Sequence, residues 1–152
     1  MYSKHHAAVS LVVSAAFVSV LEPVEVGGTT VPGLAVVVYG TALGVFIDLD
    51  HFLIARFKTG TWNALRFCFV NPLAAFTEQD RIFSRGDVGA LTRLLSHLLL
   101  TGILVPALAL TSLPLGVVTA AVLYAHIVTD VAWDIQRLRG TDLHTDDQAQ
   151  SL

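Results

Sequence analysis

The 152-residue chain is too apolar for an ordinary water-soluble domain, because 54% of its residues are hydrophobic and only 14% are charged. Its formal net charge is only -3, with no basic stripe apart from the apolar segments, which argues against a nucleic-acid-binding protein. The single cysteine, Cys68, excludes an internal disulfide and zinc sites built from two or four thiolates. We expect Cys68 to be an inert packing residue and the surplus apolar surface to face lipid.

Four apolar stretches predict an all-α, polytopic membrane bundle. With their flanking residues, each approaches the roughly 20 residues that a helix needs to cross a hydrocarbon core of about 30 Å. The first begins after Lys4, as a signal peptide would, but no cleavage site follows it, so we interpret it as a retained helix. The third is short, which leaves a re-entrant arrangement open. In chain order, the predicted spans are residues 7–21, 31–47, 98–110 and 115–132.

The connections between the spans differ in length and composition. Pro23, Pro32 and the glycines between them interrupt the chain after the first span, and Pro114 follows a tight turn between the last two. The long central segment, residues 56–92, is polar but rich in aromatic side chains. This mixture predicts helices that lie in the headgroup layer, with a loosely ordered loop as the alternative.

Charge placement predicts the orientation of the chain in the membrane. All nine Lys and Arg residues fall on one side of the predicted bundle, before the first span, in the central segment or after the fourth span. The positive-inside rule places both termini and the central segment in the cytoplasm, in a multi-pass protein of the cell membrane. Residues 140–152 are polar and acidic and predict a disordered tail, so the single membrane domain occupies residues 1–139.

Histidine and aspartate residues occur at the cytoplasmic end of every predicted span. Carboxylates at the membrane edge cost free energy unless they are paired, hydrated or bound to a cation. Asp48 and His51 are three residues apart, and His126 and Asp130 are four apart. Each pair therefore shares a helix face and could chelate one ion. The candidate ligands are Asp48, His51, His97, His126 and Asp130, together with His5 or His6.

Two further residues suit catalytic roles beside these ligands. Asp50 faces away from Asp48 in a continuous helix, but it could bridge a second ion or act as a base if the helix ends at Asp48. Arg93 lies four residues before His97 and could hold an anionic oxygen. A mixed His and carboxylate set favours zinc, with manganese or iron as alternatives, over copper(I) or calcium.

Each residue also has a structural interpretation, as an interfacial histidine, a helix cap or the polar end of a span. Trp62 and Trp133 fit interfacial anchors. His126 and Asp130 are the hardest to explain in this way, because they lie inside an otherwise apolar segment, where ionisable residues are expensive.

The order of four short motifs resembles a known family. The motifs are KHH, DLDH, RLLSH and AHIVTD, at residues 4–6, 48–51, 93–97 and 125–130. Over nearly the whole chain they resemble the LexA-binding, inner-membrane-associated hydrolases, also called YdjM-like membrane-bound metal-dependent hydrolases. The resemblance favours His6 over His5 as a metal ligand. It also implies kinship with zinc-dependent phospholipases C and single-strand-specific nucleases, whose helical folds bind clustered zinc through His and Asp.

The chain departs from the family pattern at three positions. Thr92 stands where the family has the first His of its third motif, Leu94 replaces a Gly, and Ile47 replaces a frequent Pro. One ligand or acid is therefore missing, which leaves a weakly active or inactive member open.

These features lead to two main hypotheses. The first is a metal-dependent hydrolase at the cytoplasmic membrane face, acting on a phosphoester or lipid substrate, where the choice of phosphoester comes from the resemblance alone. The second is a non-catalytic membrane scaffold or regulator with an ion-binding His/Asp cluster, which the Thr92 departure favours. A transporter is disfavoured, because the polar residues gather at one end of the bundle rather than near the midplane.

Overall fold

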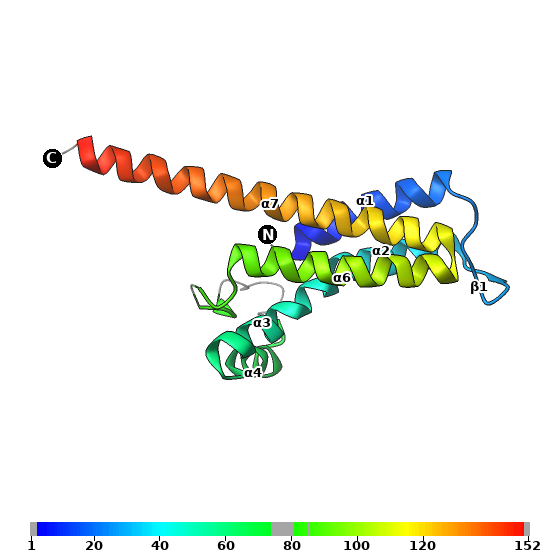
Figure 1. The fold of residues 1–152 in the computed structure, drawn as a ribbon, viewed down its shortest axis with the longest axis horizontal. Helices are drawn as coiled ribbons and strands as arrows, with labels where there is room; N and C mark the ends of the chain where they lie inside the picture. Colours follow the sequence, from blue (N-terminus) through cyan, green and yellow to red (C-terminus); the bar gives the residue numbers. More distant parts are fainter. Residues whose placement is uncertain (1–2, 74–80, 85, 151–152) are drawn as a thin grey trace.

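The computed structural model describes residues 3–73, 81–84 and 86–150, and it confirms an all-α fold with one very short hairpin. Within these ranges the chain forms a bundle with two smaller helices at one end (Figure 1). The helices are α1 (Ser3–Val20), α2 (Gly33–Phe46), α3 (Asp50–Thr59), α4 (Asn63–Val70), α6 (Ala90–Thr111) and α7 (Leu113–Gln150), and a 3₁₀ turn, η1 (Ile47–Leu49), joins α2 to α3.

Three helical segments are long and apolar enough to cross a membrane: Gly33–Thr59, Ala90–Thr111 and Leu113–Arg139. They correspond to the second, third and fourth predicted spans. The third predicted span corresponds to Ala90–Thr111, a helix of 22 residues, which is long enough to cross the bilayer. The first predicted span, now α1, is not among them, so a count of four spans is not confirmed. Lys4, His5 and His6 lie in the first turns of α1, and their polarity lowers its mean hydropathy.

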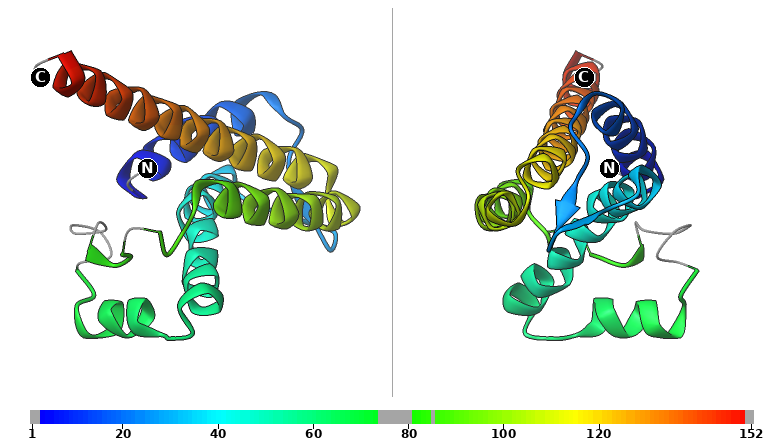
Figure 2. Two further views of the ribbon diagram at one scale, coloured as in Figure 1. Left: turned by 60° about the vertical axis from the view of Figure 1, so that its left-hand side comes forward. Right: turned by 90° about the vertical axis from the view of Figure 1, so that its right-hand side faces the viewer.

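Helix α7 holds the bundle together because it packs against α1, α2 and α6. Helices α6 and α7 run side by side in opposite directions, and α1 packs along α2 (Figures 1 and 2). The turn between α6 and α7 is tight, as predicted: the Ser112 amide donates to Leu108 and the Ser112 carbonyl accepts from Gly116. This topology brings the start of α1, the end of α2 and the start of α6 to the same end of the bundle.

The opposite end carries a two-residue hairpin that the sequence predicted only as a chain break. Strands β1 (Glu25–Val26) and β2 (Thr29–Thr30) pair antiparallel. Gly27 and Gly28 form the turn with φ angles of 59° and 78°, a conformation that favours glycine at both positions.

The predicted boundaries of the central segment and of the tail fall inside helices of the structure. Part of the central segment, residues 56–92, is helical in α3 and α4, while its placement in the headgroup layer stays a prediction. The predicted disordered tail, residues 140–152, continues α7 as far as Gln150, since little except Gly140 interrupts propagation of the helix. The domain boundary after residue 139 therefore stays a prediction.

Cys68 lies in α4 and is partly exposed. Burial raises the pKa of its thiol, which keeps the thiolate form scarce. This agrees with the expected inert role.

Candidate metal centre

The predicted ligands lie at one depth of the bundle. His6, Asp48, His97 and Asp130 are each 14 to 17 residues from the hairpin-side end of their helical segments. At a rise of about 1.5 Å per residue, that places them roughly 21 to 26 Å from the hairpin side. This is near the opposite face of a hydrocarbon core about 30 Å thick.

A first group of side chains could hold a metal ion. Asp48, His97, His126 and Asp130 each offer one ligand atom, and these atoms lie within 4.8 Å of one another. The Nε2 atom of His126 is 3.3 Å from Asp48 Oδ1 and 3.6 Å from Asp130 Oδ2. His97 reaches the same carboxylate oxygen of Asp48 from α6, at 3.5 Å.

A second group, Asp50, His51 and His97, adjoins the first and shares His97 with it. Asp50 Oδ1 is 3.4 Å from His97 Nε2 and 3.6 Å from His51 Nε2. The turn η1 contributes to this convergence, because three residues per turn bring Asp48 closer in direction to both Asp50 and His51 than an α-helix would. The segment therefore neither ends at Asp48 nor continues as a regular α-helix.

One oxygen lies at the centre of both groups. Asp48 Oδ1 has three imidazole Nε2 atoms around it, from His126 at 3.3 Å and from His51 and His97 at 3.5 Å. All four atoms are buried and none has a hydrogen-bond partner in the described part of the chain. Buried polar atoms are normally hydrogen-bonded, so several such atoms facing each other indicate a missing cation or proton.

The backbone of α2 determines how His126 presents its ring. The Nδ1 atom of His126 donates to the carbonyl oxygen of Gly44 at 2.9 Å, since a peptide carbonyl can only accept. In the neutral imidazole, Nε2 then carries the lone pair and directs it at the carboxylates of Asp48 and Asp130. A lone pair that faces a carboxylate oxygen is repelled by it unless a cation or a proton lies between them.

His6 lies beside this arrangement rather than within it. Its Nε2 atom is 3.1 Å from Asp130 Oδ1, and its ring stacks on that of His126 with centroids 3.9 Å apart. It belongs to neither group that could hold an ion. Its contact with Asp130 suits an orienting residue, and its predicted role as a direct ligand stays a prediction. Its neighbour His5 is exposed and packs near Trp133.

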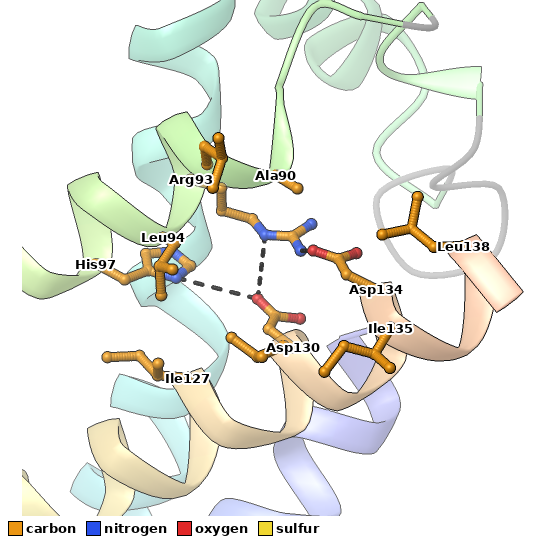
Figure 3. Close-up of a pocket in the computed structure, with 11 residues that line it drawn as sticks. Ala90, Arg93, Leu94, His97, Ile127, Asp130, Asp134, Ile135 and Leu138 are labelled. Carbon is orange, nitrogen blue, oxygen red and sulfur yellow. Dashed lines mark hydrogen bonds and ion pairs between the residues drawn. The ribbon is translucent and has the colours of Figure 1, made fainter.

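Arg93 joins α6 to α7 at the edge of the site, as Figure 3 shows. Its Nε atom is 3.3 Å from Asp130 Oδ2, and its Nη2 atom donates to Asp134 Oδ2 at 2.5 Å. The residues surround a cavity of about 170 Å³ between the two helices, and the remaining walls are mainly aliphatic. Two of the three guanidinium nitrogens are thus engaged by carboxylates, and the predicted role of Arg93 in holding an anionic oxygen stays a prediction.

The charge of the site favours a cation. Among the described residues, the site gathers the carboxylates of Asp48, Asp50, Asp130 and Asp134, and Arg93 contributes one guanidinium, which pairs with the last two. With neutral histidines, the carboxylates exceed the guanidinium by three negative charges. Such an excess is costly at the edge of a membrane unless metal ions or protons compensate it.

Three contributors to the site were absent from the predicted residue set. The Ser96 hydroxyl donates a hydrogen bond to Asp50 Oδ2, and Asp134 accepts from Arg93. Asp134 had a visible signal, because it lies four residues after Asp130, just as Arg93 lies four before His97. The third contributor, the carbonyl of Gly44, has no side chain to reveal it.

Comparison with known proteins gives no match: no family model, no curated protein and no solved structure matches this chain. The resemblance to the YdjM-like hydrolases therefore stays a prediction. The structure does bear on the Thr92 departure, because the Thr92 side chain is exposed on α6 while His97 is buried. A histidine missing from that position removes no side chain from the two groups described above.

Proposed function

We propose that this protein is a membrane-bound metalloenzyme that binds at least one divalent cation between its His and Asp side chains. The arrangement around Asp48 Oδ1 carries the proposal, since its three imidazole neighbours lie at 3.3 to 3.5 Å. Ligand atoms placed tetrahedrally at zinc-like distances of about 2.0 to 2.1 Å are roughly 3.3 to 3.4 Å apart. Zinc is the first choice for the ion, with manganese or iron as alternatives.

The proposed reaction is hydrolysis of a phosphoester. A bound divalent cation would supply an acidified water and polarise the phosphoryl oxygen. Asp50 is suited to accept a proton, because its Oδ1 atom faces the metal groups while Ser96 holds its Oδ2 atom. Arg93 would orient Asp130 through the contact at 3.3 Å. The phosphoester as substrate rests on the resemblance to the hydrolase family.

We place the reaction at the cytoplasmic face of the cell membrane, with both termini in the cytoplasm. The positive-inside rule supports this orientation, because all nine basic residues lie toward the same side as the His and Asp residues. The three long apolar helices support the membrane location.

A non-catalytic metal-binding scaffold is the second candidate. The engagement of Arg93 by Asp130 and Asp134 favours it, because a guanidinium already paired with two carboxylates has less attraction for a phosphate. This candidate predicts metal binding without turnover.

An activity measurement on the full chain in detergent separates the two. The protein, loaded with zinc or manganese, is assayed with bis(p-nitrophenyl) phosphate and with phospholipid vesicles. We expect metal-dependent release of product. The substitution His126→Ala should abolish it, whereas His5→Ala, which replaces an exposed side chain on α1, should preserve it. Metal binding without turnover would favour the scaffold, and the absence of metal binding would remove both candidates.

A further inference from the structure

A close contact between α1 and α2 adjoins the metal centre. Ser10 and Ser14 of α1 are buried at relative exposures of 1% and 0%, and they face Gly40 and Gly44 of α2. A Cβ atom added to Gly44 would lie 1.8 Å from Ser10 Oγ and 2.6 Å from Ser10 Cβ. The absence of a side chain at residue 44 therefore allows this close approach of the two helices, as it does at residue 40.

The same residue contacts the metal centre through its backbone. The Gly44 carbonyl accepts the hydrogen bond from His126 Nδ1. Gly44 lies in the last turn of α2, where helical carbonyl groups lack some of their intrahelical partners and can accept from elsewhere. The ring of His126 is only 1% exposed, so its orientation depends on these internal contacts.

We infer that Gly44 is a positioning residue of the metal centre, which rests on the proposed metal site. Its close contact with Ser10 sets the position of the α2 backbone, and its carbonyl fixes the ring orientation and tautomer of His126. A side chain at residue 44 displaces α1 from α2, moves the carbonyl and leaves His126 Nε2 poorly directed. Groups that orient a ligating histidine in this way typically contribute 10- to 100-fold to metal affinity.

The chain supplies a matched control one turn away. A Cβ atom added to Gly40 would lie 2.1 Å from Ser14 Oγ and 3.0 Å from Ser14 Cβ, a steric conflict of the same kind between the same helices. The hydrogen bond from His126, however, goes to Gly44. Gly40→Ala thus disturbs helix packing without touching the carbonyl that orients the imidazole.

The test is a Co²⁺ titration of the full chain in detergent, followed by the visible absorption of the bound ion. We expect Gly44→Ala to weaken Co²⁺ binding by about 10- to 100-fold and to change the absorption spectrum. Gly40→Ala keeps the affinity and spectrum of the wild type, although thermal unfolding shows a comparable loss of stability in both variants.

A second variant keeps the inference testable if Gly44→Ala folds poorly. Gly44→Ala combined with Ser10→Gly removes both short contacts at residue 44, and we expect it to regain wild-type affinity and spectrum. Wild-type affinity in Gly44→Ala, an equal loss in Gly40→Ala, or no recovery in the double variant would each overturn the inference. In all of these results the wild type binds Co²⁺, whereas a wild type that binds none would count against the proposed function itself.

Discussion

The two ends of the bundle are built from the same helices but are stabilised in different ways. Near the hairpin, Val24, Val36, Val118 and Val122 are buried against one another. At the other end, the buried positions are polar and include His97, His126 and Asp130, with titratable atoms 3.3 to 4.0 Å apart. The hairpin end therefore buries apolar side chains against one another, whereas the other end buries an excess of carboxylates that a metal ion or protons would offset. Four perturbations distinguish the two ends.

Removal of the metal has the largest expected effect. A ligand held at about 1,000 times its Kd stabilises the folded state by about 4 kcal/mol, so a chelator should lower the free energy of unfolding by that amount. Thermal unfolding in detergent, with and without the chelator, measures the difference. Unfolding curves that coincide would show that the polar end is stable by itself.

Asp48→Asn should have the next largest effect. The substitution keeps the size of the side chain but removes the charge from the oxygen that three imidazoles surround. We expect metal affinity to fall by more than about 100-fold, or about 2.8 kcal/mol, since the proposed function makes Asp48 a direct ligand. Titration with Zn²⁺ measures the affinity, and the chelator should no longer change the unfolding of this variant. Affinity equal to that of the wild type would exclude Asp48 from the site.

Val118→Ala tests the hairpin end. Val118 is 1% exposed, and loss of its two methyl groups should cost about 1.6 kcal/mol of stability. The free energy of unfolding reports this cost, while metal affinity should stay unchanged because Val118 belongs to the apolar cluster. A parallel loss of metal would mean that the two ends are coupled rather than separate.

His6→Ala should have the smallest effect of the four. His6 contacts Asp130 at 3.1 Å but belongs to neither ion-holding group, so its loss should weaken metal binding by about 10-fold, or about 1.4 kcal/mol. Zn²⁺ titration of His6→Ala beside His5→Ala provides the comparison, since the exposed His5 should have no effect. A loss as large as that of Asp48→Asn would make His6 a direct ligand, as the sequence predicted.

The sequence predicted the helical class, the three helical segments that are long and apolar enough to cross a membrane, and the gathering of His and Asp residues at one end. These features follow from local patterns, because apolar runs define helices and alternating directions bring particular helix ends together. The first predicted span is not confirmed, because α1 combines an apolar stretch with the polar residues Lys4, His5 and His6.

The finer geometry of the site depends on tertiary contacts that leave little trace in a single sequence. The turn η1, which directs Asp50 toward His97, interrupts an apparently uniform helix. The acceptor for His126 is a backbone carbonyl, which every residue type possesses. The pairing of Arg93 with Asp134 could have been inferred from the i, i+4 spacing on each helix, but only after α6 and α7 had been aligned.

The metal content of the full chain tests the central claim most directly. The protein is purified in mild detergent, incubated with Zn²⁺, dialysed and subjected to elemental analysis. We predict at least about one equivalent of zinc per chain in the wild type and in Val118→Ala, and a loss of zinc in His126→Ala, because direct ligands dominate affinity. Wild-type protein that retains no zinc, or His126→Ala that retains as much as the wild type, would contradict the account.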